Sequence, residues 1–215
     1  MEMDEAAKQP KFRRRAGARP DEVLDAALVL FSARGFAHTT VEAVARAAGL
    51  SKAAVYLYFP SKQALLAGLV RRAVKPVADM ALEQIVDYRG DPRPVIGAVM
   101  EMMAKRLAEP AVIALPSLIL REAAVAPEMA QVYREEVLDR VLPALRGLLA
   151  QGVAGGFIRK VDPDLTLRSL IGPVLAHLLL AQVFGVQPEG GLRLDDLVAN
   201  HLSIIFAGLA PEGKT

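Results

Sequence analysis

Four side chains in a short segment have the chemistry to bind nucleic acid: Lys52, Tyr56, Tyr58 and Lys62. An ammonium group neutralises a phosphate, and a phenolic hydroxyl donates a hydrogen bond to a phosphate oxygen or a base edge. Thr40 adds a hydroxyl at the start of a neighbouring predicted helix, where free backbone amides attract an anion. Taken singly, an exposed Tyr or Lys is usually only surface, so the grouping of these side chains carries the inference.

The residues from Thr39 to Lys62 predict two short helices joined by a tight turn. The first helix begins after Thr39 or Thr40, since either hydroxyl suits the cap position and Thr39 has capping-box spacing with Glu42. Gly49 permits the positive φ that the turn requires. Two short helices held at a fixed angle form the arrangement that places the second helix in the DNA major groove.

The second of these helices is predicted over Lys52–Phe59, with Ser51 as its cap. Val55 and Phe59 are four residues apart and face inward, which leaves Lys52, Ala53, Tyr56, Leu57 and Tyr58 on the outer faces. The small side chain of Ala53 lets the backbone approach the groove, and its methyl group suits contact with a thymine methyl. Tyr58 and Lys62 are placed for phosphates at the groove rim.

A third helix is predicted ahead of this pair, from about Pro20 to Arg34. Its apolar residues recur at helical spacing, and Gly35 suits the position after its end. Across the whole chain, 53% of residues are hydrophobic and only 5% are aromatic. Because Ala and Leu dominate and no strand alternation appears, the sequence predicts an all-α fold.

Basic residues gather at the N-terminus. Residues 1–75 contain 13 Lys and Arg against 7 Asp and Glu, whereas residues 76–215 contain 13 against 17, so the balances are +6 and −4. This asymmetry indicates a basic module for a polyanion. Residues 1–18 are predicted to form a flexible arm that reaches DNA phosphates or a minor groove. A solvated tail accounts for their basic composition equally well. The arginines assigned to the DNA-binding arm are Arg13, Arg14, Arg15 and Arg19.

Residues 19–66 resemble the N-terminal domain of TetR-family transcriptional regulators. The matching residues are Ala26-Ala27-Leu28, Leu30-Phe31, Gly35-Phe36, Thr39-Thr40-Val41, Val44-Ala45, Ala48-Gly49-Leu50-Ser51, Val55-Tyr56, Tyr58-Phe59, Ser61-Lys62 and Leu65-Leu66. The resemblance implies an all-helical homodimer with a helix-turn-helix in each subunit and a C-terminal ligand-binding and dimerisation domain. Thr40, Tyr58 and Lys62 then correspond to phosphate contacts. One departure is Ala54, which lacks the hydroxyl that many relatives carry there.

The resulting domain plan has three parts. Residues 1–18 form the arm, residues 19–70 a three-helix DNA-binding domain and residues 71–215 a larger helical domain. A helix that starts near Lys62 crosses this boundary, and Lys75-Pro76 interrupts it because proline removes a backbone hydrogen bond. Turn signals in the remainder predict helices over 77–88, 92–108, 110–125, 127–153, 163–185 and 193–209.

Two of the later helices are candidates for a dimer interface. The helix over 163–185 is apolar nearly all round, and the last helix is amphipathic, so both can bury a face against a partner. The resemblance implies a four-helix interface built from these two helices and their symmetry mates. An intramolecular core is the alternative. The residues assigned to the interface are Leu170, Val174, Leu178, Leu197, His201 and Ile205.

Three methionines on the helix over 92–108, together with leucines and isoleucines on the helix over 110–125, suggest a pocket for an apolar small molecule, because methionine adapts to irregular cavities. For any single residue, core packing is the alternative. His177 offers a polar handle within such a pocket or is a satisfied core histidine. The residues assigned to the pocket are Met100, Met103, Leu107, Leu118, Ile119, Arg121 and His177.

Other functional classes fit less well. The chain has no cysteine, and its three histidines lack metal-ligand spacing, so neither a metal nor another cofactor is expected. No phosphate-binding loop, dinucleotide fingerprint or nucleophile elbow is present, which argues against an enzyme. A helical protein–protein adaptor remains the alternative, but it leaves the basic segment unexplained. With no secretory signal, and an apolar run at 174–186 too short to span a membrane, we expect a cytoplasmic protein.

These observations predict a ligand-dependent regulator, most simply a repressor. A homodimer would place two recognition helices in successive major grooves of a palindromic operator. A small-molecule effector that prefers the other arrangement of the dimer would release the DNA. The identity of the effector does not follow from the sequence.

Overall fold

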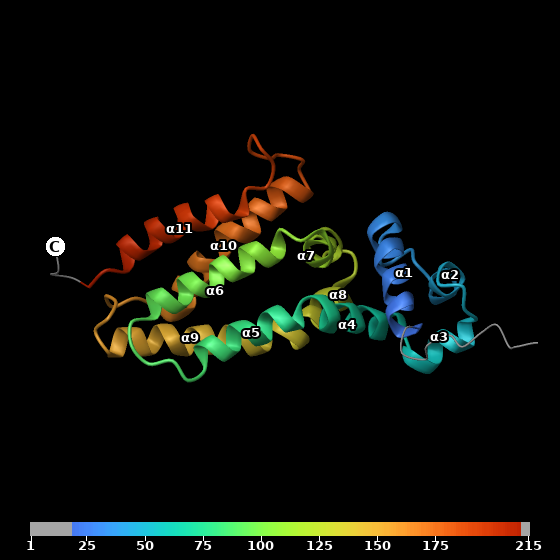
Figure 1. The fold of residues 1–215 in the computed structure, drawn as a ribbon, viewed down its shortest axis with the longest axis horizontal. Helices are drawn as coiled ribbons and strands as arrows, with labels where there is room; N and C mark the ends of the chain where they lie inside the picture. Colours follow the sequence, from blue (N-terminus) through green and yellow to red (C-terminus); the bar gives the residue numbers. More distant parts are fainter. Residues whose placement is uncertain (1–18, 212–215) are drawn as a thin grey trace, which may run out of the picture.

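The computed structural model describes residues 19–211, and within them every regular element is helical (Figure 1). This confirms the predicted all-α class. The elements are α1 (Arg19–Arg34), α2 (Val41–Ala47), α3 (Lys52–Tyr58), α4 (Lys62–Ala73), α5 (Lys75–Ile85), α6 (Pro92–Leu107), α7 (Pro110–Glu122), α8 (Pro127–Tyr133), a π-helical turn (Arg134–Leu138), α9 (Asp139–Ala154), α10 (Pro163–Gln182) and α11 (Leu194–Leu209).

The predicted breaks mostly coincide with the observed ones. Helix α4 ends at Ala73, and α5 begins at Lys75 with Pro76 in its first turn, where proline costs no helical hydrogen bond. One prediction was wrong: the single helix expected over 127–153 is three elements, because a π-helical turn at Arg134–Leu138 separates α8 from α9. Because π-helix occurs mostly as a single turn inside a longer α-helix, the helical pattern of the sequence did not reveal this interruption.

The first apolar core, which also includes residues of α4, α7 and α8, holds α1, α2 and α3 together. Phe31 and Phe36 are fully buried and meet edge to face, with ring centroids 5.0 Å apart. Val44 and Val55 add one fully buried side chain each from α2 and α3. Since α2 and α3 have seven residues each, this burial supplies stability that such short helices lack alone.

Side-chain caps fix where these short helices begin. The hydroxyls of Thr40 and Ser51 accept hydrogen bonds from the amides of Ala43 and Ala54, at 3.1 Å in both cases. Thr40 is therefore the cap of α2. Thr39 instead is 2% exposed, and its hydroxyl donates to the Gly35 carbonyl at 2.8 Å. The choice between the two threonines that the sequence left open is thereby settled.

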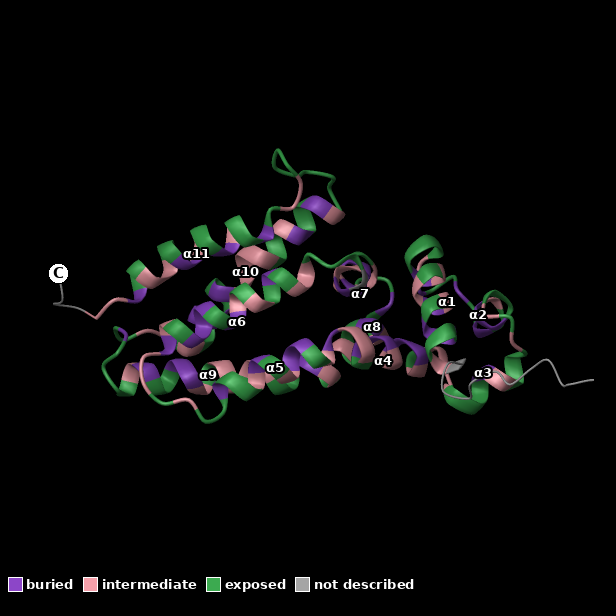
Figure 2. Cartoon of the chain, in the orientation of Figure 1, coloured by how far each residue is buried: buried purple, intermediate pink, exposed green. Residues whose placement is uncertain are grey.

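The remaining helices form a larger bundle at the other end of the elongated chain (Figure 1). Buried residues of α5, α6, α9, α10 and α11 make a second apolar core, and α6 packs closely along α11. Figure 2 shows buried residues running inside this bundle while the outer faces stay exposed. Helices α5, α7 and α9 contribute side chains to both cores, so the two ends share helices.

Helix α10 is longer than the apolar run recognised in the sequence. It has 20 residues, and within 19–211 it is the one helix whose length and composition alone would permit a membrane span. The helix predicted over 163–185 agrees with α10 to within three residues, and the apolar run at 174–186 covers only its C-terminal part and the residues that follow. In the fold α10 packs against α7, α9 and α11, with Leu167, Leu170 and Leu178 buried.

Two glycines of α9 provide a test of this packing. A Cβ at Gly152 would lie 2.5 Å from Cγ of the rigid Pro92 ring, whereas one at Gly147 would meet nothing within 4 Å. We expect Gly152→Ala to destabilise the protein by about 1–3 kcal/mol through overpacking. The matched Gly147→Ala should stabilise it by about 0.5–1 kcal/mol, because alanine suits a helix interior better. Thermal unfolding of both variants measures the difference, and equal midpoints would contradict the packing described here.

Candidate DNA-binding interface

Helix α3 exposes most of its side chains at the far end of the molecule from the C-terminus (Figures 1 and 2). Only Val55 within the helix is buried, and Phe59 directly after it is half-buried. Tyr56 and Tyr58 are 42% and 39% exposed, and Lys52 and Ala53 are exposed as well. The four side chains predicted on α3 thus all reach solvent from one short helix.

Local contacts orient part of this surface. The Lys52 ammonium lies 5.9 Å from the centroid of the Tyr56 ring, within the range of a cation–π interaction. Thr40 is exposed at the start of α2, where its hydroxyl already accepts the Ala43 amide. Its hydroxyl proton is still free to donate to a phosphate oxygen, because the cap uses only an acceptor lone pair.

Lys62 has an internal role that its sequence position did not reveal. Its ammonium group donates to the carbonyls of Phe36 and Ala37, at 2.8 and 3.2 Å, and lies 4.4 Å from the centroid of the Phe36 ring. The side chain thereby ties the start of α4 to the loop between α1 and α2. Its third N–H is the one that these contacts leave for a phosphate.

Sequence reasoning placed Leu57 on an outer face of the helix but did not assign it to the site. Its side chain is 84% exposed, more than any other large apolar residue among those described. Helical geometry accounts for this, since Leu57 lies two positions after the buried Val55 and points to the opposite side. The signal was available in the sequence: a leucine out of phase with the buried positions of a recognition helix.

The arm predictions fall largely beyond the described residues. Arg13, Arg14 and Arg15 lie outside residues 19–211, and Arg19 opens α1 without a described side chain. Their assignment to DNA stays a prediction.

The residues assigned to the dimer interface occupy mixed positions. Leu170 and Leu178 are 3% and 2% exposed within their own chain, so they are not available to a partner in this conformation. Val174, Leu197 and Ile205 are half-buried against the same core. His201 is half-buried too, and its Nε2 has no hydrogen-bond partner among the described residues.

Other apolar residues of these helices face solvent. On α10 and just after it, the large exposed side chains are those of Leu165, Leu175, Leu179, Leu180, Val183, Phe184 and Val186; on α11 it is that of Ile204. We call the exposed residues on and just after α10 the apolar strip of α10. Its central residues Leu175 and Leu179 each follow by one position the predicted interface residues Val174 and Leu178.

The residues assigned to an effector pocket are dispersed between the cores and the surface. Leu118 and Ile119 are buried in the first core, while Met100 and Leu107 pack against the second. Met103 and Arg121 are exposed.

His177, the remaining member of that set, pairs through its Nε2 with the carbonyl of Leu192. This contact fits the satisfied core histidine that the sequence left as the alternative.

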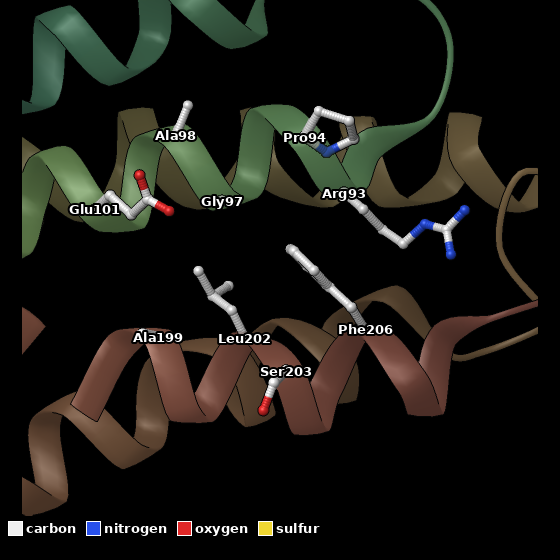
Figure 3. A pocket seen from close by; sticks show the side chains of 9 residues that line it. All are labelled: Arg93, Pro94, Gly97, Ala98, Glu101, Ala199, Leu202, Ser203 and Phe206. Carbon is white, nitrogen blue, oxygen red and sulfur yellow. The ribbon is translucent and has the colours of Figure 1, made fainter. Parts of the chain in front are cut away.

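Two of the hollows in the described part of the chain bear on the predicted pocket. One, of about 470 Å³, lies between α6 and α11 and is floored by Gly97, Leu202 and Phe206, with Arg93 and Glu101 toward its two ends (Figure 3). The other, of about 300 Å³, is lined by residues of α1, α4, α6 and α7. None of the seven predicted pocket residues lines either hollow.

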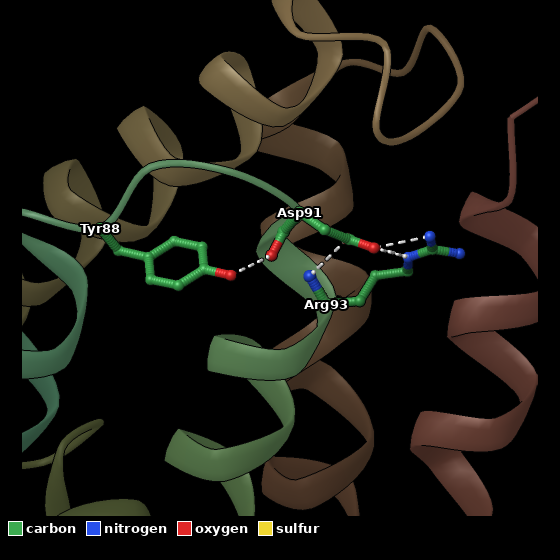
Figure 4. Close-up of polar contacts among 3 residues, drawn as sticks. All are labelled: Tyr88, Asp91 and Arg93. Atoms are coloured by element: carbon green, nitrogen blue, oxygen red, sulfur yellow. Dashed lines mark hydrogen bonds and ion pairs between the residues drawn. The ribbon is translucent and has the colours of Figure 1, made fainter.

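Arg93, at the end of the larger hollow, is already paired. Its guanidinium contacts both carboxylate oxygens of Asp91, which also caps α6 by accepting the Arg93 amide at 3.0 Å (Figure 4). These hydrogen bonds from Arg93 lower the pKa of Asp91 below its ordinary value. Tyr88 donates to the Asp91 carbonyl at 2.9 Å and fixes the turn. The arginine is therefore part of a helix cap as well as of the hollow.

Comparison with known proteins agrees with this geometry. A sequence model of bacterial regulatory proteins of the tetR family matches residues 23–69, which span α1 to most of α4. A second, for the tetracyclin repressor-like C-terminal domain, matches residues 86–184.

Individual relatives match along most of the chain. The transcriptional regulator AcrR of Shigella flexneri is 24% identical over 187 residues, covering 83% of this chain and 87% of AcrR. The transcriptional repressor KstR2 of Rhodococcus jostii is 28% identical over 194 residues, covering 89% and 91%.

A solved structure also matches the fold. SmeT, the repressor of the Stenotrophomonas maltophilia multidrug efflux pump SmeDEF, superimposes with a TM-score of 0.72 at 28% identity, covering 90% of this chain and 91% of SmeT. Its complex with triclosan gives a TM-score of 0.77 at 26% identity, covering 91% and 93%. With a helix-turn-helix at one end and a helical bundle at the other, this chain belongs to the TetR family of ligand-responsive transcriptional regulators, which are DNA-binding proteins and not enzymes.

Proposed function

We propose that the chain is a cytoplasmic repressor that binds a palindromic operator as a homodimer and is released by a small, apolar effector. The proposed contact with DNA is supported by the exposed surface of α3, where the side chains of Tyr56, Leu57 and Tyr58 face solvent and one valine of the helix is buried. Polar and apolar groups on one short helix suit the mixed hydrogen-bonding and methyl pattern of the major groove.

The proposed roles differ along this face. Tyr58, Thr40 and the remaining N–H of Lys62 contact phosphates, which position the domain on the duplex. Lys52 and Tyr56 reach base edges or the phosphates beside them. Leu57 and Ala53 contribute sequence preference through contact with thymine methyls, because neither side chain can donate a hydrogen bond.

Dimerisation is proposed through the apolar strip of α10 together with the outer face of α11. Without a partner, these apolar side chains face water. Contiguous exposed apolar patches mark interaction sites, so this surface favours a protein partner. A two-fold interface would place two copies of α3 on the same side of the dimer, which matches the symmetry of a palindromic site.

The effector is proposed to bind in the domain over residues 71–215, near the methionines of α6. Met100 and Met102 pack against the second core without being fully buried, and methionine side chains rearrange readily to admit a ligand. The triclosan complex of SmeT supports a small molecule as the class of effector. Repression is supported by the repressors KstR2 and SmeT among the relatives.

Substitutions on α3 test the DNA contact. We expect Tyr56→Ala to weaken binding to an operator enriched from random DNA by at least tenfold, because a contact at a base edge is worth about 1–3 kcal/mol. Val29→Ala, on the exposed outer side of α1, is the control and should bind as the wild type does. Lys62→Ala is a poorer test, since it also removes the contacts that hold the α1–α2 loop. Unchanged affinity of Tyr56→Ala in fluorescence anisotropy would remove α3 from the interface.

Salt provides a second test, of the phosphate contacts. Each phosphate neutralised by Lys or Arg releases counterions, so the operator association constant should fall steeply as salt rises. With six or more phosphate contacts per dimer, affinity is expected to drop about 10³-fold between 50 and 200 mM salt. The same anisotropy titration at four salt concentrations gives the slope, and a flat response would argue against a phosphate-dominated interface.

The dimer has its own test on α10. Leu175→Glu with Leu179→Glu should yield a monomer, because burying two carboxylates in an apolar interface is unfavourable. Both side chains are exposed within the chain, at 46% and 36%, so the monomer fold and its circular dichroism should be preserved. Light scattering after size exclusion measures the mass, with Val29→Glu combined with Val86→Glu as an equally charged control at exposed sites. A dimer that persists in the double variant would place the interface elsewhere.

A further inference from the structure

The loop between α1 and α2 is held from the other domain by one carboxylate. The Phe36 amide donates to Oε2 of Glu122 at 2.8 Å, across 86 positions of sequence. Glu122 is the last residue of α7, and its side chain is half-buried where it meets the loop. A hydrogen bond from an amide to a carboxylate is stronger than one between neutral groups.

Gly35 makes this close approach possible. Its φ is +83°, a conformation that side chains other than glycine rarely adopt. A Cβ at this position would lie 2.8 Å from Oε2 and 3.0 Å from Oε1 of Glu122. The loop is therefore shaped to admit the carboxylate as well as to end α1.

The same loop also forms hydrogen bonds with residues of the DNA-binding end itself. Lys62 donates to the Phe36 carbonyl, and the buried hydroxyl of Thr39 donates to the Gly35 carbonyl. Thr40, which caps α2, follows four residues after Phe36. Because these contacts leave the loop little freedom, a displacement of the Phe36 amide is passed to the start of α2, which packs against α3.

Helix α7 reaches from this loop into the larger domain. Leu115, Leu118 and Ile119 are buried in the core that includes α1 and α4, whereas Ile113 and Leu120 pack against the second core. A helix wedged between two cores moves as a unit when either rearranges, since packed interiors transmit strain. Its last residue is the one that holds Phe36.

The Glu122 contact has no parallel among the described residues. Within residues 20–211, it is the one hydrogen bond or ion pair that joins residues 20–61 to residues 74–211. The ion pairs of Arg72 with Asp21 and Asp25 stay within α1 and α4, and that of Arg71 with Glu136 links α4 to the π-helical turn.

We propose that Glu122 is a coupling residue, through which a shift of α7 changes the position of the helix-turn-helix. The inference rests on the proposed function, since it names how the operator-binding end is regulated. The two atoms are 2.8 Å apart, and an increase of about 1 Å in this distance breaks the hydrogen bond. A small movement of α7 therefore suffices to release the loop. By linkage, DNA bound to α3 must bias α7 to the same extent.

Because coupling is reciprocal, operator DNA itself serves as the probe. The duplex is one enriched from a random-sequence library by the wild-type protein, and hydrogen exchange is followed over residues 92–122 with and without it. We expect the duplex to alter exchange in α6 and α7 of the wild type. In Glu122→Ala that change should fall by at least half, while the dissociation constant for the duplex stays within tenfold.

Two further variants make the test specific. Glu122→Gln keeps an acceptor oxygen for the Phe36 amide and should retain most of the response. Glu83→Ala removes an equal charge from an exposed site on α5 and should behave as the wild type does. In the protein without DNA, the Phe36 amide should exchange at least tenfold faster in Glu122→Ala than in Glu122→Gln, as measured by NMR.

The outcomes separate the two proposals. Failure of the wild type to enrich any duplex would overturn the proposed function and the coupling that rests on it. If the wild type binds its duplex but the response in α6 and α7 is the same in Glu122→Ala, only the role of Glu122 is overturned. Equal Phe36 exchange in the Ala and Gln variants would likewise show that the carboxylate does not hold the loop.

Discussion

The burial of Phe36 is the interaction on which the DNA-binding end depends. Helices α2 and α3 are too short to persist alone, so their position comes from the core that this ring fills with Phe31. The backbone around Phe36 adds a second constraint, since its amide and carbonyl are bound by Glu122 and Lys62. One residue thus joins the recognition helices to α4 and to α7.

What the sequence predicted well was local. The caps, the glycine turn and the apolar spacing of α1 to α4 depend on residues within about five positions of each other, and the predicted elements agree with the structure. The all-α class and the family followed from the same signals. The exposed positions of Lys52, Ala53, Tyr56 and Tyr58 also followed from helical phase.

What it predicted poorly depends on distant contacts. Nothing near Lys62 indicates that its ammonium binds the carbonyls of Phe36 and Ala37, and nothing near Glu122 points to an amide 86 residues away. The phase of α10 was also ambiguous, because a helix with apolar residues on nearly every side does not reveal which leucines its own core takes. Leu170 and Leu178 went inward, and Leu175 and Leu179 stayed outside.

The sharing of α5, α7 and α9 between the two cores has a consequence for how the chain is divided. Leu65, Leu66 and Leu69 of α4 are buried against a core to which α7 and α8 contribute Leu115, Leu118 and Met129. Truncating the chain near residue 70 would therefore expose these three leucines of α4 to water. The boundary near residue 70 follows the order of the helices along the chain, but the apolar contacts continue across it. The helix-turn-helix is therefore stabilised in part by the domain that is proposed to regulate it. A substitution that destabilises the shared core is therefore expected to destabilise both parts of the chain.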